Sequence, residues 1–220
     1  AKNMFDSGRW GNLFHGGLKE YFDNLRSVYR YTSTLSFHFT LLKGKSAFEV
    51  NPVDLIAVEC LRVFEPDVYR EIRRAKKIFT KNGSDRYGRS KESISTLVSG
   101  ILDKASAGKR EPVEEIVEQL FPTIEWALGG TQYSEGFAST WLREMRICHP
   151  SNFDKYFQFS IPSGELSNSD LREMLDLTSD SERFSAFILS LKERGILKNA
   201  LSQFESFTDE VPLDKAHNYI

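Results

Sequence analysis

The chain has 220 residues, of which 40% are hydrophobic, 13% aromatic and 27% charged. This length allows a large buried core, and a formal net charge of -2 argues against a general polyanion-binding protein. Two cysteines are too few for a disulfide framework, so a reducing cytoplasm is the expected compartment. No apolar run approaches the roughly 18 residues that a membrane span needs. If the chain is part of a longer protein, that protein could still associate with a membrane through another segment.

The first clear helix is predicted to begin near Asn24, with Asp23 or Asn24 as its N-cap. Apolar residues then recur in steps of three and four and predict one buried stripe, made of Leu25, Val28, Leu35, Phe39 and Leu42. Arg26 and Arg30 lie four residues apart at the edge of this stripe, so they are neighbours on the helix surface.

The residues from Asn51 onward predict the start of a second helix. Asn51 can cap it, Pro52 fits the first helical position, and Asp54 lies in the first turn, where the helix dipole favours an acid. The residues that follow are apolar nearly all round the helix, which predicts burial on every side. Pro66 interrupts this pattern, and a further helix is predicted over about 67–79.

Residues 80–91 are polar and contain two glycines, which predicts a loop. Helical periodicity returns in three segments, near residues 94–105, 113–120 and 137–145. The pair His149-Pro150 is expected to end the last of them, because a residue before proline avoids the helical conformation.

The C-terminal quarter carries two capping-box spacings. Ser167 with Asp170, and Ser179 with Glu182, each predict the start of a helix. Gly195 separates a last helical stretch from the one before it.

These patterns predict an all-α protein, an irregular multi-helix bundle with no sheet of consequence. In chain order we expect a leader over 1–16, a helical sensor or lid-like region over 17–79, a basic loop over 80–91, a helical body over 92–165 and a C-terminal helical hairpin or subdomain over 166–220. Because the chain opens without methionine, we interpret the leader as part of a truncated upstream region.

Several segments resemble the KAP family of P-loop NTPases, in particular its bacterial members. The resemblance rests on NLRSVYR at 24–30, VNPVDLIA at 50–57, LRVFEP at 61–66, LFP at 120–122, RICHP at 146–150 and FDKYFQFS at 153–160. It covers roughly residues 17–79 and 119–165.

The resemblance implies that this chain is the non-catalytic helical region after an ATP-binding core. ATP and magnesium would be held by the upstream P-loop core of the same protein, with no cofactor in this fragment. Arg26 and Arg30 match the family's sensor arginines, whose planar guanidinium groups suit phosphate oxygens. A role in phage defence or signalling would also follow from the family.

A basic run offers an alternative function. Its members are Arg70, Arg73, Arg74, Lys77, Arg86 and Arg89. A helical interaction module could bind nucleic acid or a protein through this 70–91 face without any nucleotide. Interleaved Glu71 and Asp85 weigh against nucleic acid and favour a solvated or partner-docking face. No metal site is predicted, since no ligand pairs have suitable spacing, and a homo-oligomer remains open.

Overall fold

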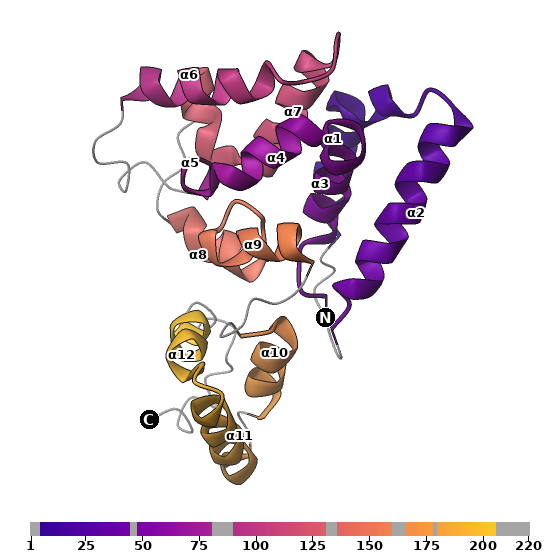
Figure 1. Ribbon diagram of the computed structural model, residues 1–220. Helices are drawn as coiled ribbons and strands as arrows, with labels where there is room; N and C mark the ends of the chain where they lie inside the picture. Colours follow the sequence, from indigo (N-terminus) through magenta and orange to yellow (C-terminus); the bar gives the residue numbers. More distant parts are fainter. Residues whose placement is uncertain are drawn as a thin grey trace.

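A computed structural model shows an all-α, multi-helix protein (Figure 1), which confirms the predicted fold class. The structure describes residues 5–44, 48–80, 90–130, 136–159, 166–177 and 180–205. These ranges contain no strand, only an isolated antiparallel bridge between Lys43 and Phe48. Nor does any helix within them combine the length and apolar character needed to cross a membrane.

The chain folds into a main body and a smaller C-terminal unit (Figure 1). The main body comprises α1 (Ser7–Gly16), η1 (Leu18–Tyr21), α2 (Leu25–Leu41), α3 (Pro52–Phe64), α4 (Pro66–Arg74), α5 (Lys76–Thr80), α6 (Lys91–Leu102), α7 (Arg110–Leu120), η3 (Pro122–Leu128), α8 (Gly136–Arg143) and α9 (Pro150–Gln158). The C-terminal unit comprises α10 (Asn168–Asp176), α11 (Ser181–Glu193) and α12 (Leu197–Glu205).

Helix α3 lies at the centre of the main body, as its apolar sequence predicted. The Asn51 side chain caps it by accepting hydrogen bonds from the backbone N–H groups of Val53 (3.0 Å) and Asp54 (3.2 Å). Side chains around the helix are fully buried, among them Val53, Leu55, Ala57 and Cys60. Helices α1, α2, α4 and α7 pack around α3.

Helix α2 lies along the edge of the main body. Most of its predicted stripe faces the core, since Leu42 is buried and Leu35 and Phe39 pack against the main core. Asn24 does cap it, accepting a hydrogen bond from the backbone N–H of Ser27 at 2.9 Å. The buried residues within the helix, however, are Tyr31 and His38, whereas Leu25 is 78% exposed.

Polar contacts hold this side of α2 against the core. The Tyr31 hydroxyl donates a hydrogen bond to the Ile56 carbonyl at 2.7 Å, and His38 Nδ1 lies 2.8 Å from Glu59 Oε2. The Arg62 guanidinium holds the same carboxylate through bonds of 2.9 and 2.6 Å. Because buried polar groups must find partners, these contacts fix the facing of α2, and apolar spacing cannot reveal them.

The pair His149-Pro150 starts a helix, which corrects the expectation that it ends one. Helix α8 has already ended before Met145, whose φ of 53° turns the chain. His149 then caps α9 through Nδ1, which accepts a hydrogen bond from the Ser151 N–H at 3.3 Å. Pro150 fits the first helical position because no hydrogen-bonded N–H is needed there.

Other predicted helices are present with shifted boundaries. The helix expected over 67–79 is two helices, separated at Ala75. The capping box at Ser167 is confirmed, whereas Ser179 lies outside the described residues. Asp180 caps α11 instead, accepting a hydrogen bond from the Arg183 N–H at 3.1 Å.

The segment assigned to a leader contributes to the main core. Asp6 caps α1 by accepting hydrogen bonds from the N–H groups of Gly8 (2.9 Å) and Arg9 (3.0 Å). Leu13 on this helix is buried, and α1 packs against α3 and α7. Residues 7–16 are therefore an integral helix of the main body.

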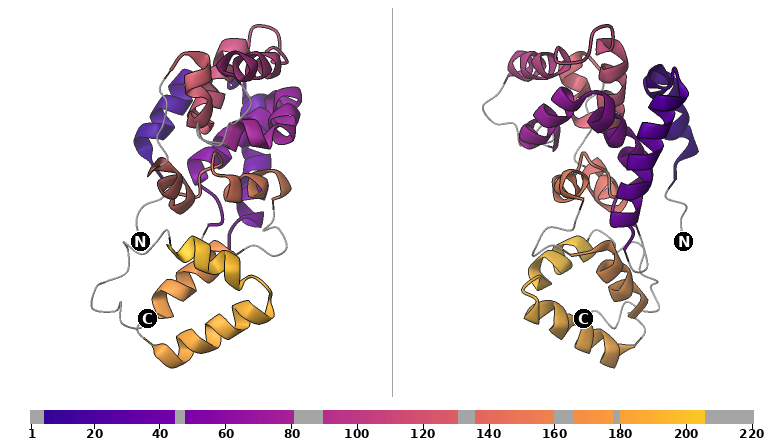
Figure 2. Two further views of the ribbon diagram at one scale, coloured as in Figure 1. Left: turned by 90° about the vertical axis from the view of Figure 1, so that its left-hand side faces the viewer. Right: turned by 45° about the vertical axis from the view of Figure 1, so that its right-hand side comes forward.

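The C-terminal unit has a hydrophobic core of its own, made of Leu166, Leu171, Met174, Leu191, Ile196, Ala200 and Phe204. The unit lies to one side of the main body in each view (Figure 2). Glu49 of the main body joins the two, since its buried carboxylate accepts the N–H groups of Asn168 (2.6 Å) and Ser169 (3.3 Å). Asn168 Nδ2 also donates to the Phe48 carbonyl at 2.7 Å.

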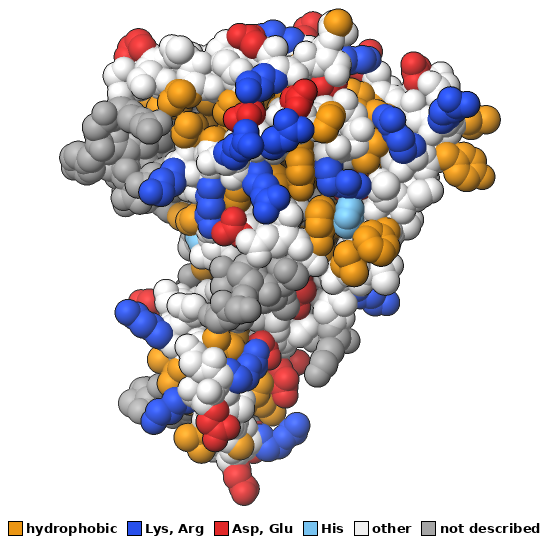
Figure 3. All heavy atoms as spheres, viewed as in Figure 1, with side chains coloured by type: hydrophobic (Ala, Val, Ile, Leu, Met, Phe, Trp, Pro, Cys, Tyr) orange, Lys and Arg blue, Asp and Glu red, His pale blue; other side chains and the backbone are white. Residues whose placement is uncertain are grey.

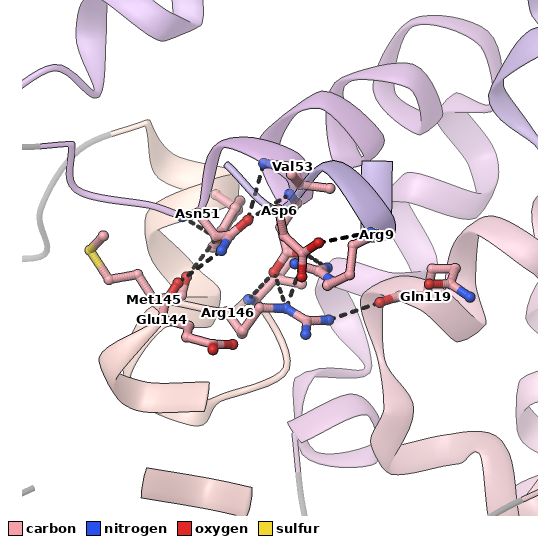
Figure 4. Close-up of polar contacts among 11 residues, drawn as sticks. Asp6, Arg9, Asn51, Val53, Gln119, Glu144, Met145 and Arg146 are labelled. Carbon is pink, nitrogen blue, oxygen red and sulfur yellow. Dashed lines mark hydrogen bonds and ion pairs between the residues drawn. The ribbon is translucent and has the colours of Figure 1, made fainter. Parts of the chain in front are cut away.

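A buried carboxylate, Asp54, ties together segments that are distant in sequence, and Figure 4 labels its partners Arg9 and Arg146. Arg146 Nε donates to its two oxygens at 2.9 and 3.1 Å, and the Ile147 N–H donates at 2.9 Å. Arg9 of α1 forms an ion pair with the same carboxylate. Arg146 Nη2 continues to the Gln119 carbonyl at 2.8 Å, so α1, α3, α7 and the α8–α9 turn meet at one charge.

Burial alone would raise the pKa of the Asp54 carboxyl. The charges of Arg146 and Arg9, with the hydrogen bond from the Ile147 N–H, outweigh burial and hold that pKa below its usual value. The carboxylate is therefore ionised at neutral pH, and its two arginine partners depend on that charge.

Replacing Asp54 by Asn should lower the free energy of unfolding by about 3–5 kcal/mol, because the change leaves buried arginine charge without its partner. Asp67→Asn is the matched control, since Asp67 occupies the first turn of α4 and pairs with Arg70 in an exposed position. It should cost at most about 1 kcal/mol. Urea denaturation of the two variants measures both, and equal losses would refute a central role for Asp54.

The cap of α9 should make stability depend on pH. Burial, with a smaller effect of Lys155, lowers the pKa of His149 to about 4 from the ordinary 6.5. Between pH 6.5 and pH 4, His149 is protonated in the unfolded chain but neutral in the folded protein. The free energy of unfolding should therefore fall by about 2–3 kcal/mol as the pH drops through this range. Protonation also removes the Nδ1 lone pair that accepts the Ser151 N–H.

The measurement is chemical denaturation of the wild type and of His149→Asn, which keeps a capping oxygen but cannot titrate. The two proteins should have similar stability at pH 7, and the wild type should lose more as the pH falls from 6.5 to 4. Parallel pH profiles would contradict the assignment.

Candidate functional site

The two arginines that resemble nucleotide sensors, Arg26 and Arg30, are exposed near the start of α2. The Arg30 guanidinium lies over the ring of Phe64, with Cζ 4.7 Å from the ring centroid. Within the described ranges neither arginine forms an ion pair with a carboxylate, in contrast to Arg62 on the neighbouring helix.

The ring beneath Arg30 belongs to an aromatic cluster built from η1, α2 and α3. Phe64 stacks on Tyr21 (5.1 Å between centroids) and on Tyr31 (6.2 Å), and Phe22 meets its edge at 6.1 Å. A cation over an aromatic face gains roughly 0.5–1 kcal/mol at an exposed site. The cluster therefore orients Arg30, whereas Arg26, one turn earlier, has no comparable support among the described contacts.

A second buried carboxylate, that of Glu65, contacts this aromatic cluster through Tyr21. Glu65, at the junction of α3 and α4, accepts hydrogen bonds from the Tyr21 hydroxyl (3.0 Å) and from the Ser106 N–H (2.7 Å). Burial and then the Glu65 charge raise the pKa of Tyr21 far above its usual value, so its hydroxyl stays a donor. Lys109 Nζ lies 5.2 Å from the centroid of the Tyr21 ring, on the turn before α7.

Sequence reasoning missed these supporting residues. Glu65 appeared only as part of a motif, and its partner Ser106 is 41 residues away. Phe64 lies in the apolar run of the second predicted helix, where nothing in the sequence indicates that an arginine covers it. Contacts of this kind leave no periodic signal, so spacing could not have found them.

The arrangement can bind an anion. Neighbours four residues apart on a helix are about 5–6 Å apart at Cβ, so both guanidinium groups can approach one phosphate. In the part of the chain that the structure describes, no group of three or more His, Cys, Asp and Glu could hold a metal ion. The exposed arginines offer charge and hydrogen-bond donors to such an anion.

The basic face predicted over 70–91 is partly neutralised. Arg70 pairs with Asp67 (2.9 Å) and Arg74 with Glu71 (3.0 Å), each acid lying three residues earlier on α4. Lys104 also reaches Glu71, at 3.3 Å. The surface over α4 accordingly intermingles both signs of charge (Figure 3).

The remaining members of that face are Arg73, Lys77, Arg86 and Arg89. Arg73 and Lys77 are exposed and form no ion pair among the described residues. Arg86 and Arg89 lie outside the described residues. Of the six predicted members, two are thus described and form no ion pair there, fewer than a continuous phosphate-tracking stripe requires.

No family model, curated protein or solved structure matches this chain. The resemblance to the KAP family therefore stays a prediction.

The mixed charges on α4 predict weak binding to nucleic acid. At physiological salt the chain should bind a short DNA duplex with a dissociation constant no tighter than about 100 μM, the weak end of non-specific binding. Fluorescence anisotropy of a labelled duplex measures it. Micromolar, salt-dependent binding that Arg73→Ala and Lys77→Ala abolish would instead favour the interaction-module function.

Proposed function

We propose that this chain is the non-catalytic helical region of a KAP-type P-loop NTPase of the cytoplasm. Its exposed arginines Arg26 and Arg30 would contact the phosphates of ATP held, with magnesium, by an upstream core of the same protein. Loss of the γ-phosphate would remove that contact and shift the packing of the helical region on the core. The nucleotide state would then reach partners through the helical surface.

The observation that carries this proposal is the freedom of the two arginines from carboxylates within the described ranges. An arginine already paired with an acid must give up that partner before it can bind phosphate. Arg30 is instead oriented by an uncharged ring, Phe64, which leaves its donors available. The charge of each guanidinium persists at any working pH.

The test is ATP turnover by the full-length protein that contains this chain. Arg26→Ala should lower kcat by tenfold or more, equivalent to about 1.4 kcal/mol of lost transition-state stabilisation. Arg30→Ala should act in the same direction. The matched control is Arg183→Ala, which removes an exposed arginine from α11 in the C-terminal unit and should leave turnover unchanged.

Two further variants separate sensing from folding. Arg26→Lys keeps the charge but loses the planar fork, so it should restore only part of the rate. Circular dichroism should show every variant to be as helical as the wild type. Unchanged turnover in Arg26→Ala would make Arg26 a structural residue, and absence of any turnover in the wild type would leave the interaction module as the better function.

A further inference from the structure

The two exposed arginines of α2 differ in how near they lie to the rest of the main body. At 100° per residue, Arg30 lies about 100° round the helix from buried Tyr31, whereas Arg26 lies about 140° from it. Arg30 is therefore closer to α3, which packs beside α2. Its guanidinium reaches Phe64, the last residue of α3, and this is a contact that Arg26 lacks among the described residues.

The ring of Phe64 is itself held in place by its neighbours. Tyr21 and Tyr31 both stack on it, with their ring planes 22° and 24° from its own. Each tyrosine is fixed in turn by its hydroxyl, since Tyr21 donates to Glu65 at 3.0 Å and Tyr31 donates to the Ile56 carbonyl at 2.7 Å. The ring beneath Arg30 is therefore a fixed surface.

An arginine that is already ordered binds phosphate at a lower entropic cost than a free one. A long side chain loses rotamer freedom when a ligand fixes it, and the loss is smaller when the unliganded protein already holds the side chain. Arg30 has this advantage because it lies on a fixed ring. Arg26 has no ring partner among the described residues, so a ligand would have to order it.

The contact with Phe64 orders Arg30 without withholding it from a ligand. A cation over an aromatic face at an exposed site is stabilised by a factor of about two to five. Charge-assisted hydrogen bonds between a guanidinium and phosphate are stronger than this. Arg62 differs, because Glu59 already holds its guanidinium through bonds of 2.9 and 2.6 Å. Arg30 is thus both ordered and available.

We propose that Arg30 is the principal phosphate contact of this site, that Phe64 is its positioning residue, and that Arg26 has an auxiliary role. This rests on the proposed function, to which it adds an order between the two arginines and a residue that acts only through one of them. Resemblance to a family gives both arginines the same role. The packing of α2 on α3 distinguishes them, because only Arg30 lies over the Phe64 ring.

ATP turnover by the full-length protein tests both assignments. Arg30→Ala should lower kcat more than Arg26→Ala does. Phe64→Leu, which keeps an apolar side chain but removes the ring, should lower kcat by about two- to fivefold, the strength of the cation–ring contact. Phe64→Tyr retains the ring and should keep the wild-type rate. Phe39→Leu is the matched control, since Phe39 is also a partly buried ring, packed on Phe48, and it should leave kcat unchanged.

Double variants separate positioning from a general packing defect. In an Arg30→Ala background, Phe64→Leu should cause no further loss of kcat, because the residue through which it acts is gone. In an Arg26→Ala background it should cause the same loss as in the wild type. Equal losses in the two backgrounds, an equal loss in Phe39→Leu, or a larger loss in Arg26→Ala than in Arg30→Ala would each overturn the proposal.

Nuclear magnetic resonance of the 220-residue chain tests the contact without ATP. Protons above an aromatic face resonate upfield, so the side-chain protons of Arg30 should lie upfield of those of Arg26. Phe64→Leu should remove this difference, and Phe64→Tyr should keep it. Absence of the shift would overturn the positioning by Phe64 alone. The shift together with unchanged turnover in Arg30→Ala would instead overturn the phosphate contact, and with it the proposed function.

Discussion

The carboxylate of Asp54 is the charge on which the packing of the main body depends. It lies in the first turn of α3, fully buried, and binds Arg9 from α1 together with Arg146 from the turn between α8 and α9. A buried ion is tolerated only when its partners are placed well, because removal from water costs several kcal/mol. The contact therefore selects one relative placement of α1, α3 and the α8–α9 turn, to which Arg146 adds the end of α7.

Once α3 is held at its first turn, its other end positions the candidate site. Phe64 lies under Arg30, and the adjacent Glu65 anchors Tyr21 and the turn before α7. Midway along the helix, Glu59 receives His38 and so fixes the rotation of α2. The exposed arginines face outward because these buried polar contacts hold another side of α2 against the core.

The C-terminal unit is attached to the main body by hydrogen bonds to one carboxylate, that of Glu49. Its hydrophobic core is separate, and Glu49 joins it to the main body by accepting the first N–H groups of α10. A carboxylate at a helix N-terminus is favoured by both the unpaired N–H groups and the helix dipole. A few directed hydrogen bonds can thus set the position of a unit that contributes little apolar surface to the main core.

The sequence by itself determined the helical class and many of the helix starts. Asn24, Asn51 and Ser167 cap helices as their local patterns indicate, because caps and periodicity act within three or four residues. Tertiary structure alone decided that Tyr31 and His38 join the buried side of α2 while Leu25 does not, that His149-Pro150 begins α9, and that Asp54 meets an arginine 92 residues away. These outcomes depend on buried polar partners brought together by the fold, and no local spacing encodes them.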